Sequence, residues 1–341
     1  MADQHSTDRP IGVVLLNLGG PDTLDAVKPF LLDLFSDREI VRLPGGRIGQ
    51  AIIGRIIVAA RLKRVKENYA SIGGSSPILR LTLLQAESLE VFLREKGINA
   101  VVRPAMRYWR PFTEETLSEL KRAGIRRLVA LTLYPHYSIA TTGSSINELQ
   151  RVIERDFASD FEITYITEWP ELPGYLDALA AKIESALKEV SEDRRDKVTL
   201  LFSAHGLPVD FIDRGDPYIE HIETTIDGVM SRLERKPPWC LAYQSRVGPV
   251  KWLEPTTPDT MRRLAAEGVR DVVIVPVSFV TDHIETLEEI DRQFGRLANE
   301  LGYSTFHRTK ALNDDPMFIS ALGNLVLDHL QSAGFEEVRN G

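Results

Sequence analysis

The segment AGIRRLVALTLYP at residues 123–135 recurs as EGVRDVVIVPVSF at residues 267–279. The residues that lead into the copies also recur at one spacing, with Pro111, Thr113, Thr116, Leu120 and Gly124 matched by Pro255, Thr257, Thr260, Leu264 and Gly268. Both copies predict a turn, an amphipathic helix, a glycine stop and a buried strand. This internal duplication predicts an α/β protein with two similar βαβ-type layers, each covered by helices on both faces.

Two further buried strands lie outside these copies, IGVVLLNL at 11–18 and VTLLFSAH at 198–205. Each strand ends at a Gly/Pro turn, and aligning the two turns places Leu18 in the position of His205. In open α/β sheets, ligands bind at the carboxyl ends of the strands. A histidine there can accept a proton near neutral pH or ligate a metal, or it can pack and hydrogen-bond as a structural residue.

An acidic segment, TDHIETLEEID at 281–291, follows the second copy directly. A helix that begins near Thr281 would place Glu285 and Glu289 four residues apart on one face, where like charges repel unless a cation or proton lies between them. A solvated acidic helix start, favoured by the helix dipole, is the alternative. Because His283 and Glu285 follow a fully apolar strand, we expect them to share one sheet edge with His205.

The chain length of 341 residues favours two domains. We expect a first domain at 9–165, a second domain at 166–312 that carries the metal site, and a C-terminal helix within 313–335 that packs back on the first domain. The first half is longer between its first strand and its repeated glycine, and the surplus falls at about 44–80. Insertions at a sheet edge commonly carry function.

Within this insertion, the apolar run from Ile48 to Ala60 is followed by a basic stretch that starts at Arg61. A short apolar helix with a basic end can lie on an anionic membrane surface, or it can be a lid or buried helix whose basic end is solvated. Arg107 and Tyr108 leave a strand beside a tryptophan, which suits either a flat anionic ligand or a stacked surface cluster. Trp252 lies in a Gly/Pro-rich loop and is expected to be exposed.

Composition narrows the class of protein. The net charge of −8 argues against nucleic-acid binding, and the single cysteine, Cys240, fits a reducing compartment. The polar start MADQHSTDRP shows no secretory signal, and no apolar run reaches the ~20 residues that span a bilayer, so we expect a cytoplasmic protein, peripheral to the membrane at most. Hydrolase, P-loop, dinucleotide and structural zinc motifs are absent. A histidine that faces acidic side chains suits transient handling of a divalent cation and of protons.

Taken together, the motifs of the chain resemble those of the ferrochelatases along nearly its whole length. The matching motifs are LNLGGP (16–21), YASIGGSSP (69–77), RYW-RP (107–111), YPHYS-ATTGSS (134–145), LFSAHGLP (201–208), RGDPY (214–218), QSRVGPVKWLEP (244–255) and TDHIETLEEID (281–291). The resemblance implies insertion of Fe(II) into protoporphyrin IX, the last step of haem synthesis. It also implies two Rossmann-like domains of the chelatase fold with the porphyrin in a cleft between them.

The resemblance also implies roles for individual residues. His205 and Glu285 would form the metal and proton site, with His283 in the same inner shell. Which of His205 and Glu285 is the base and which the metal ligand stays open. The acids expected to form a conduit are Glu289, Asp291 and Asp282. The residues that match porphyrin-pocket positions are Leu18, Arg61, Tyr69, Ser76, Arg107, Tyr108 and Trp252.

Two departures from the family pattern matter. Many relatives carry a cysteine-ligated [2Fe–2S] cluster, which this chain cannot hold with Cys240 alone, so we expect no permanently bound cofactor. Leu18 replaces a methionine of some relatives and cannot ligate a metal, so metal binding should depend on His205 and Glu285. A chelatase for another divalent metal or for coproporphyrin, and a porphyrin or haem carrier, remain alternatives.

Overall fold

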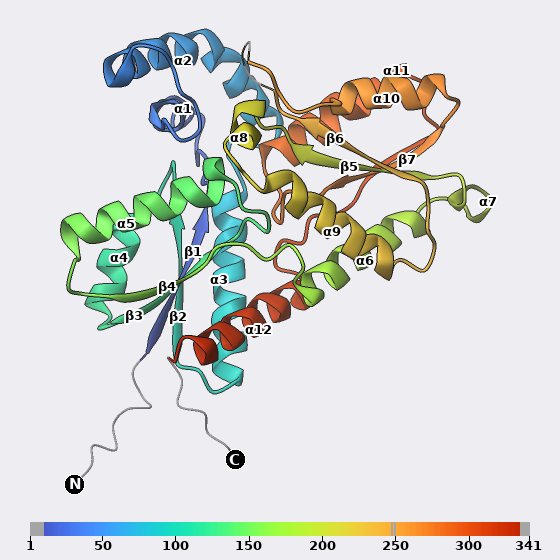
Figure 1. Cartoon of the computed structure of the whole chain (residues 1–341). Helices are drawn as coiled ribbons and strands as arrows, with labels where there is room; N and C mark the ends of the chain where they lie inside the picture. Colours follow the sequence, from blue (N-terminus) through green and yellow to red (C-terminus); the bar gives the residue numbers. More distant parts are fainter. Residues whose placement is uncertain (1–9, 247, 249, 335–341) are drawn as a thin grey trace.

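A computed structural model describes residues 10–246, 248 and 250–334. Its strands form two parallel sheets with the orders β2-β1-β3-β4 and β6-β5-β7-β8 (Figure 1). The strands of the first sheet are β1 (Ile11–Asn17), β2 (Ala100–Met106), β3 (Arg127–Thr132) and β4 (Glu162–Ile166). Those of the second are β5 (Thr199–His205), β6 (Trp239–Gln244), β7 (Asp271–Pro276) and β8 (Thr305–Arg308). The identical orders confirm the fold predicted from the duplication.

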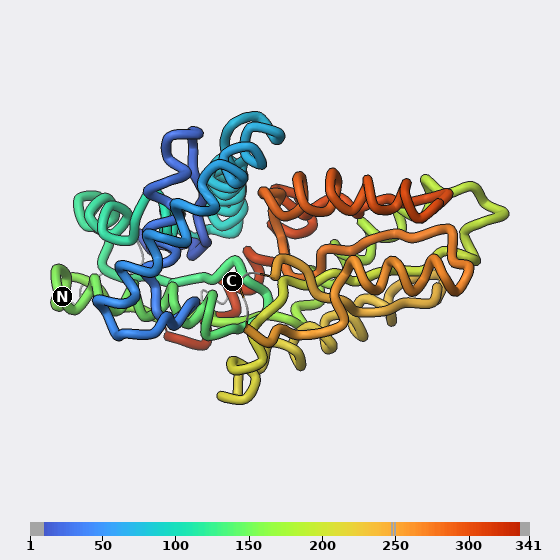
Figure 2. The backbone as a smooth tube through the Cα atoms, turned by 90° about the horizontal axis from the view of Figure 1, so that it is seen from above, coloured from blue at the N-terminus to red at the C-terminus, as the bar shows by residue number. Residues whose placement is uncertain are grey.

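The strands are parallel because each is followed by a helical crossover that returns the chain to the same end of the sheet. Every residue of β1 is buried, and so is every residue of β5 except His205. Such continuous apolar strands need helices on both faces of the sheet. The tube view in Figure 2 shows the two halves side by side along the long axis of the molecule.

Helices cover both sheets. In the first half they are α1 (Val27–Ser36), α2 (Gly46–Ser71), α3 (Ile78–Glu95), α4 (Thr113–Arg122), η1 (Ile139–Gly143) and α5 (Ser144–Asp156). In the second they are α6 (Pro173–Lys188), α7 (Glu192–Arg195), α8 (Val209–Asp213), α9 (Tyr218–Arg232), α10 (Thr257–Ala266), η2 (Glu285–Phe294) and α11 (Gly295–Glu300). The last helix, α12 (Pro316–Ser332), packs on both α3 and α6.

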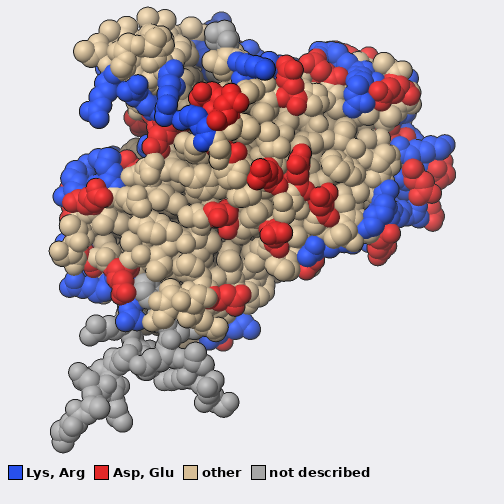
Figure 3. Space-filling model, viewed as in Figure 1, with Lys and Arg blue, Asp and Glu red and all other residues tan. Residues whose placement is uncertain are grey.

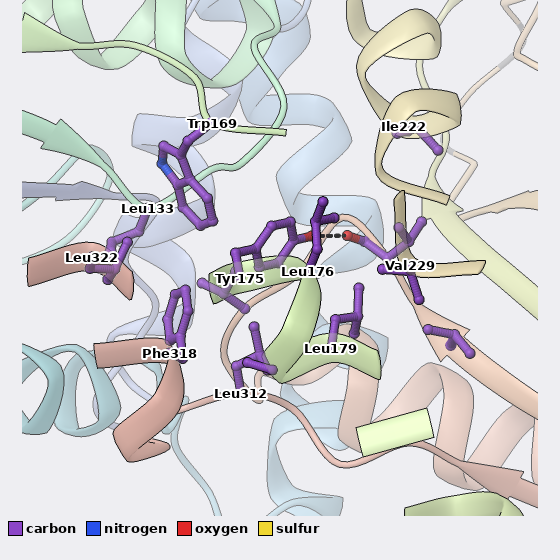
Figure 4. Packing of buried hydrophobic residues seen from close by; sticks show 14 of the residues in the cluster. Leu133, Trp169, Tyr175, Leu176, Leu179, Ile222, Val229, Leu312, Phe318 and Leu322 are labelled. Atoms are coloured by element: carbon purple, nitrogen blue, oxygen red, sulfur yellow. Dashed lines mark hydrogen bonds between the residues drawn. The ribbon is translucent and has the colours of Figure 1, made fainter. Parts of the chain in front are cut away.

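An aromatic cluster attaches α12 to the second half. Phe318 lies 5.9 Å from Trp169 and 6.4 Å from Tyr175 between ring centroids (Figure 4). Gly323 lets α12 approach α3, because a Cβ atom there would lie 2.1 Å from the Phe92 ring. The domain boundaries at 165/166 and 312/313 stay predictions, and residue 335 lies outside the described residues.

Two expectations for individual elements are wrong. The helix expected at Ile48 to Ala60 runs the full 26 residues of α2, because the basic stretch continues the helix and carries Tyr69 in its last turns. The acidic helix does not begin near Thr281. The backbone N–H groups of Asp282 and His283 donate to side chains, to Asn313 Oδ1 at 2.9 Å and to Thr286 Oγ1 at 3.0 Å, respectively. The segment then winds as the π-helix η2 from Glu285.

Candidate active site

His205 is the last residue of β5, and backbone contacts from two elements fix it there. Its N–H donates to Ser278 Oγ at 2.9 Å, and its C=O accepts from the Tyr218 hydroxyl at 3.0 Å. The imidazole lies edge-on to the Phe279 ring, with 6.2 Å between centroids. The ring is therefore held at the carboxyl end of the sheet, where the sequence placed it.

The imidazole of His205 contacts the carboxylate of Glu285, the first residue of η2. Nδ1 of His205 donates to Glu285 Oε2 at 2.8 Å, and His283 Nε2 lies 3.9 Å from the same oxygen. The His283 ring is oriented by its own Nδ1–H, which donates to the Thr281 carbonyl at 3.1 Å. The side chains of His205 and Glu285 remain 34% and 22% exposed, so a substrate can still reach the pair.

Glu289 joins this pair through Ser245, the residue after β6. The Ser245 hydroxyl lies 3.1 Å from Glu285 Oε2 and also bonds Glu289 Oε2. The Ser245 N–H donates to Glu289 Oε1 at 3.0 Å. The end of β5, the residue after β6 and η2 thus bring His205, Glu285 and Glu289 together. His205, His283 and Glu285 lie at one edge, as their positions after buried strands indicated.

Each charge in the cluster changes the protonation of its neighbours. Burial alone would lower the pKa of His205, but the carboxylates of Glu285 and Glu289 raise it above its ordinary value. Burial would raise the pKa of Glu285, but the imidazoles of His205 and His283 hold it well below its usual range. Burial and the charge of Glu285 raise the pKa of Glu289. An imidazolium–carboxylate pair backed by a second acid is the arrangement that results.

The two other expected conduit acids are engaged elsewhere. Arg308 donates to Asp291 at 2.7 Å and to Asp282 at 3.0 Å, and its side chain is only 12% exposed. A cavity of about 610 Å³ beside the end of η2 has Asp291 in its wall together with Arg292, Arg296 and Arg308. Three guanidinium groups make this cavity a poor entrance for a cation.

In the first half, three of the expected pocket residues lie in one apolar cluster. Leu18, Tyr69 and Tyr108 pack in this cluster with α1 and α2, and Ile284, the neighbour of Glu285, packs against it. Burial raises the pKa of Tyr69, and the charge of Glu285 raises it further. The apolar cluster of the first half therefore adjoins the acidic helix of the second.

Arg107 and Tyr108 belong to a buried polar network around Asp37. One oxygen of Asp37 accepts from Arg107 at 2.7 Å, from the Tyr108 hydroxyl at 2.6 Å and from Ser144 at 2.6 Å. Burial would raise the pKa of Asp37, but these partners and the Glu39 amide lower it. This network ties the end of α1 to the carboxyl end of β2 and to the start of α5.

The remaining expected pocket residues are Arg61, Ser76 and Trp252. The Arg61 guanidinium lies 5.9 Å from the Phe35 ring centroid, and burial lowers its pKa. Ser76 lies against Gly20, where a Cβ atom would approach its hydroxyl to 2.6 Å. Trp252 is only 9% exposed, so its expected exposure is wrong, because the loop folds back and Pro208 bridges it. Its buried indole N–H has no protein partner.

Several residues that hold the site were not singled out from the sequence. They are Asp37, Ser144, Tyr218, Ser245, Ser278 and Phe279. Ser278 and Phe279 could have been found, since they are the last two residues of the second copy, at its carboxyl end. Tyr218, Ser144 and Ser245 lie within the motifs RGDPY, ATTGSS and QSRVGPVKWLEP, whereas Asp37 gave no local signal.

Within the described ranges, no three or more His, Cys, Asp or Glu side chains have the arrangement of a complete metal site. A metal bound at Glu285 would therefore need other ligands, such as water or the nitrogens of an organic substrate. The same part of the chain contains no helix that is both long and apolar enough to cross a membrane.

Comparison with known structures defines the class of protein first. SirB from Bacillus subtilis with Fe3+ has the same fold, with a TM-score of 0.55 and 11% identity over 96% of this chain and 98% of that chain. DR2241 from Deinococcus radiodurans, a multi-domain protein with structural similarity to chelatases, matches with a TM-score of 0.50 and 13% identity over 93% of this chain and 54% of that chain. The architecture is the two-domain chelatase fold.

Sequence comparison then identifies the family. The ferrochelatase family model matches residues 10–330. Similar relatives include the ferrochelatase of Geotalea daltonii, 51% identical over 92% of this chain and 96% of the relative, and that of Trichodesmium erythraeum, 45% identical over 94% and 83%. The chain belongs to the ferrochelatase family. It is a metal chelatase, a lyase of haem biosynthesis.

Proposed function

We propose that this enzyme inserts Fe(II) into protoporphyrin IX to give protohaem. The metal replaces the two pyrrole N–H protons, so each turnover releases two protons and needs a base beside an anionic metal ligand. The contact of 2.8 Å between His205 Nδ1 and Glu285 Oε2 supports this most directly, because it places both groups within one hydrogen bond. Glu289 lies behind them through Ser245.

In this proposal His205 accepts the pyrrole protons and Glu285 binds the metal. A cation that binds Glu285 displaces the imidazolium from the carboxylate. Once the imidazolium has released its proton to solvent, the neutral imidazole can accept the pyrrole protons one at a time and pass each to solvent. Glu289 then assists in removing protons or in exchanging the water ligands of the metal. Asp282 and Asp291 form ion pairs with Arg308, so in this proposal they are not part of the proton or metal route.

The macrocycle would lie against the apolar cluster of Leu18, Tyr69 and Tyr108, with Trp252 on the opposite half. Ile284 supports this placement, because it packs against that cluster and is the neighbour of Glu285, the proposed metal ligand. A pocket that holds the porphyrin bent would expose the nitrogen lone pairs and so favour the transition state. Arg61, Ser76 and Arg107 are the proposed partners of the propionates, which need charge or hydroxyl groups once removed from water.

A stopped assay with Fe(II), Co(II) and Zn(II), each with protoporphyrin IX and coproporphyrin, tests the proposal. We expect the highest kcat/KM with Fe(II) and protoporphyrin IX. Faster turnover of coproporphyrin or a strict preference for another metal would identify a different chelatase. Tight porphyrin binding without turnover would identify a carrier. No resident cofactor is proposed, so sulfide analysis of anaerobically purified protein should find no stoichiometric cluster.

We also infer that α2 touches an anionic membrane surface. Ile48, Ile52 and Ile56 are 76%, 53% and 62% exposed at a spacing of four residues, so they share one face of the helix. Exposed basic residues accompany them on α2, namely Arg47, Arg55, Lys63 and Arg64. In the view of Figure 3, the tip of the α2 region at the upper left shows no charged side chains, and a band of Lys and Arg lies beneath it. Apolar side chains beside cations match the interface of an anionic bilayer.

A further inference from the structure

Ser245 has a backbone conformation that serine rarely adopts. Its φ is +66°, and the only other residue besides glycine with positive φ in the described ranges is Asn313. The left-handed region is unfavourable for a side chain with a Cβ atom, and glycine would adopt it without strain. Strained residues of this kind persist where the side chain has a function that glycine cannot supply.

The contacts of Ser245 indicate that function. Its hydroxyl lies between the two carboxylates of η2, 3.1 Å from Glu285 Oε2 and in a shorter contact with Glu289 Oε2. Its N–H donates to Glu289 Oε1 at 3.0 Å. The left-handed backbone at Ser245 turns both its hydroxyl and its N–H toward η2. The strained conformation is therefore what allows both hydrogen bonds to form.

Without this hydroxyl, the carboxylates of Glu285 and Glu289 would lose the hydrogen-bond partner that they share. Glu285 also bonds His205, whereas Ser245 supplies the hydrogen bonds of Glu289. Like charges four residues apart on a helix repel, and a donor between them offsets the repulsion. The position of Glu289 relative to Glu285 therefore depends on Ser245.

We propose that Ser245 is a positioning residue that holds Glu285 and Glu289 at a fixed separation for the incoming metal. This inference depends on the proposed function, in which Glu285 is the metal ligand. Ser245 does not touch the metal or the porphyrin in this arrangement. It acts through the two carboxylates, so its loss should affect metal binding far more than porphyrin binding.

Three variants separate positioning from structural support. Ser245→Gly removes the hydroxyl and the strain but keeps the N–H, so its Tm should be unchanged or raised by about 1–2 °C. Its KM for Fe(II) should rise roughly tenfold or more, the usual cost of losing a hydrogen bond to a charged group. Ser245→Ala should raise the KM similarly with no gain in Tm. Ser245→Thr keeps the hydroxyl on a more strained backbone, so it should lower Tm and retain the KM for Fe(II).

Two further measurements make the result decisive. Titration of each porphyrin-free variant with Co(II), followed by absorption, should show the same order of metal affinity without any turnover. The KM for porphyrin should stay within about twofold of the wild-type value. Ser231→Ala, which removes a hydroxyl bonded to Gly228 on α9, is the control and should change neither quantity.

The possible failures are distinguishable. If the wild-type enzyme inserts no metal, the proposed function is wrong. If it does insert metal, but Ser245→Gly keeps the wild-type KM for Fe(II) and the wild-type affinity for Co(II), the positioning role is wrong. A loss of Tm in Ser245→Gly with unchanged metal affinity would show that the serine serves only the loop.

Discussion

His205 is the residue whose replacement should reduce turnover most. His205→Ala removes the proposed base and the partner of Glu285, so we expect kcat to fall by about 10²–10⁴. Tm should change little, because the ring is partly exposed and the backbone contacts to Ser278 and Tyr218 do not use it. Steady-state assays and thermal melts measure both. Activity within about threefold of the wild-type value would contradict the assignment.

His136 should make the free energy of unfolding depend on pH. It is buried between the halves, where its Nε2 contacts Thr225 Oγ1 at 2.9 Å, and burial together with the nearby His221 lowers its pKa to about 3. An unfolded chain protonates histidine near pH 6.5. Between these values the unfolded state binds the extra proton, so the free energy of unfolding must decrease as pH falls from about 6.5 toward 3.

Urea unfolding of the wild-type protein and of His136→Gln at pH 7.5 and 5.0 measures this contribution. Glutamine can still bond Thr225 but does not titrate. We expect the wild-type protein to lose roughly 2 kcal/mol more than the variant between the two pH values. Equal losses would show that His136 is protonated in the folded state.

At the scale of single elements, the two functions proposed for α2 can be separated by substitutions. Ile52→Glu combined with Ile56→Glu should weaken sedimentation with anionic vesicles and slow turnover of membrane-delivered porphyrin. Turnover of detergent-dispersed porphyrin should be nearly unchanged, because both side chains point to solvent. Arg61→Ala should raise the KM for porphyrin in both assays. If the paired variant binds vesicles like the wild-type protein, the membrane surface must lie elsewhere.

The elements also show what sequence patterns can and cannot predict. Buried runs that end at Gly/Pro turns located β1 and β5, and the internal duplication located β7, so these sequence signals placed His205 and Glu285 at one edge. The late start of η2 depends on a partner in another part of the chain, because Asn313 Oδ1 accepts from the amide of Asp282. Ser245 meets Glu285 and Glu289 only in the folded chain, 40 and 44 residues away, and no periodicity marks it.

At the scale of the whole molecule, α12 should control how firmly the halves are joined. Gly323→Ala places a Cβ atom against the Phe92 ring at 2.1 Å, so overpacking should cost about 1–3 kcal/mol and lower Tm by several degrees. Gly295→Ala, where a Cβ atom meets nothing within 4 Å, is the matched control and should not lower Tm. Calorimetry compares the two variants. Equal Tm values would mean that the α3–α12 contact relaxes freely.

The π-type winding of η2 also limits how this segment can change over generations. Its turns close from residue i to i+5, and each residue of an ordinary helix advances by about 100°. Loss or gain of one codon between Glu285 and Glu289 would therefore swing the second carboxylate away from Ser245, even if every other residue stayed the same. Evolution can therefore substitute the residues between Glu285 and Glu289 one at a time, but an insertion or deletion among them would separate Glu289 from Ser245 at once.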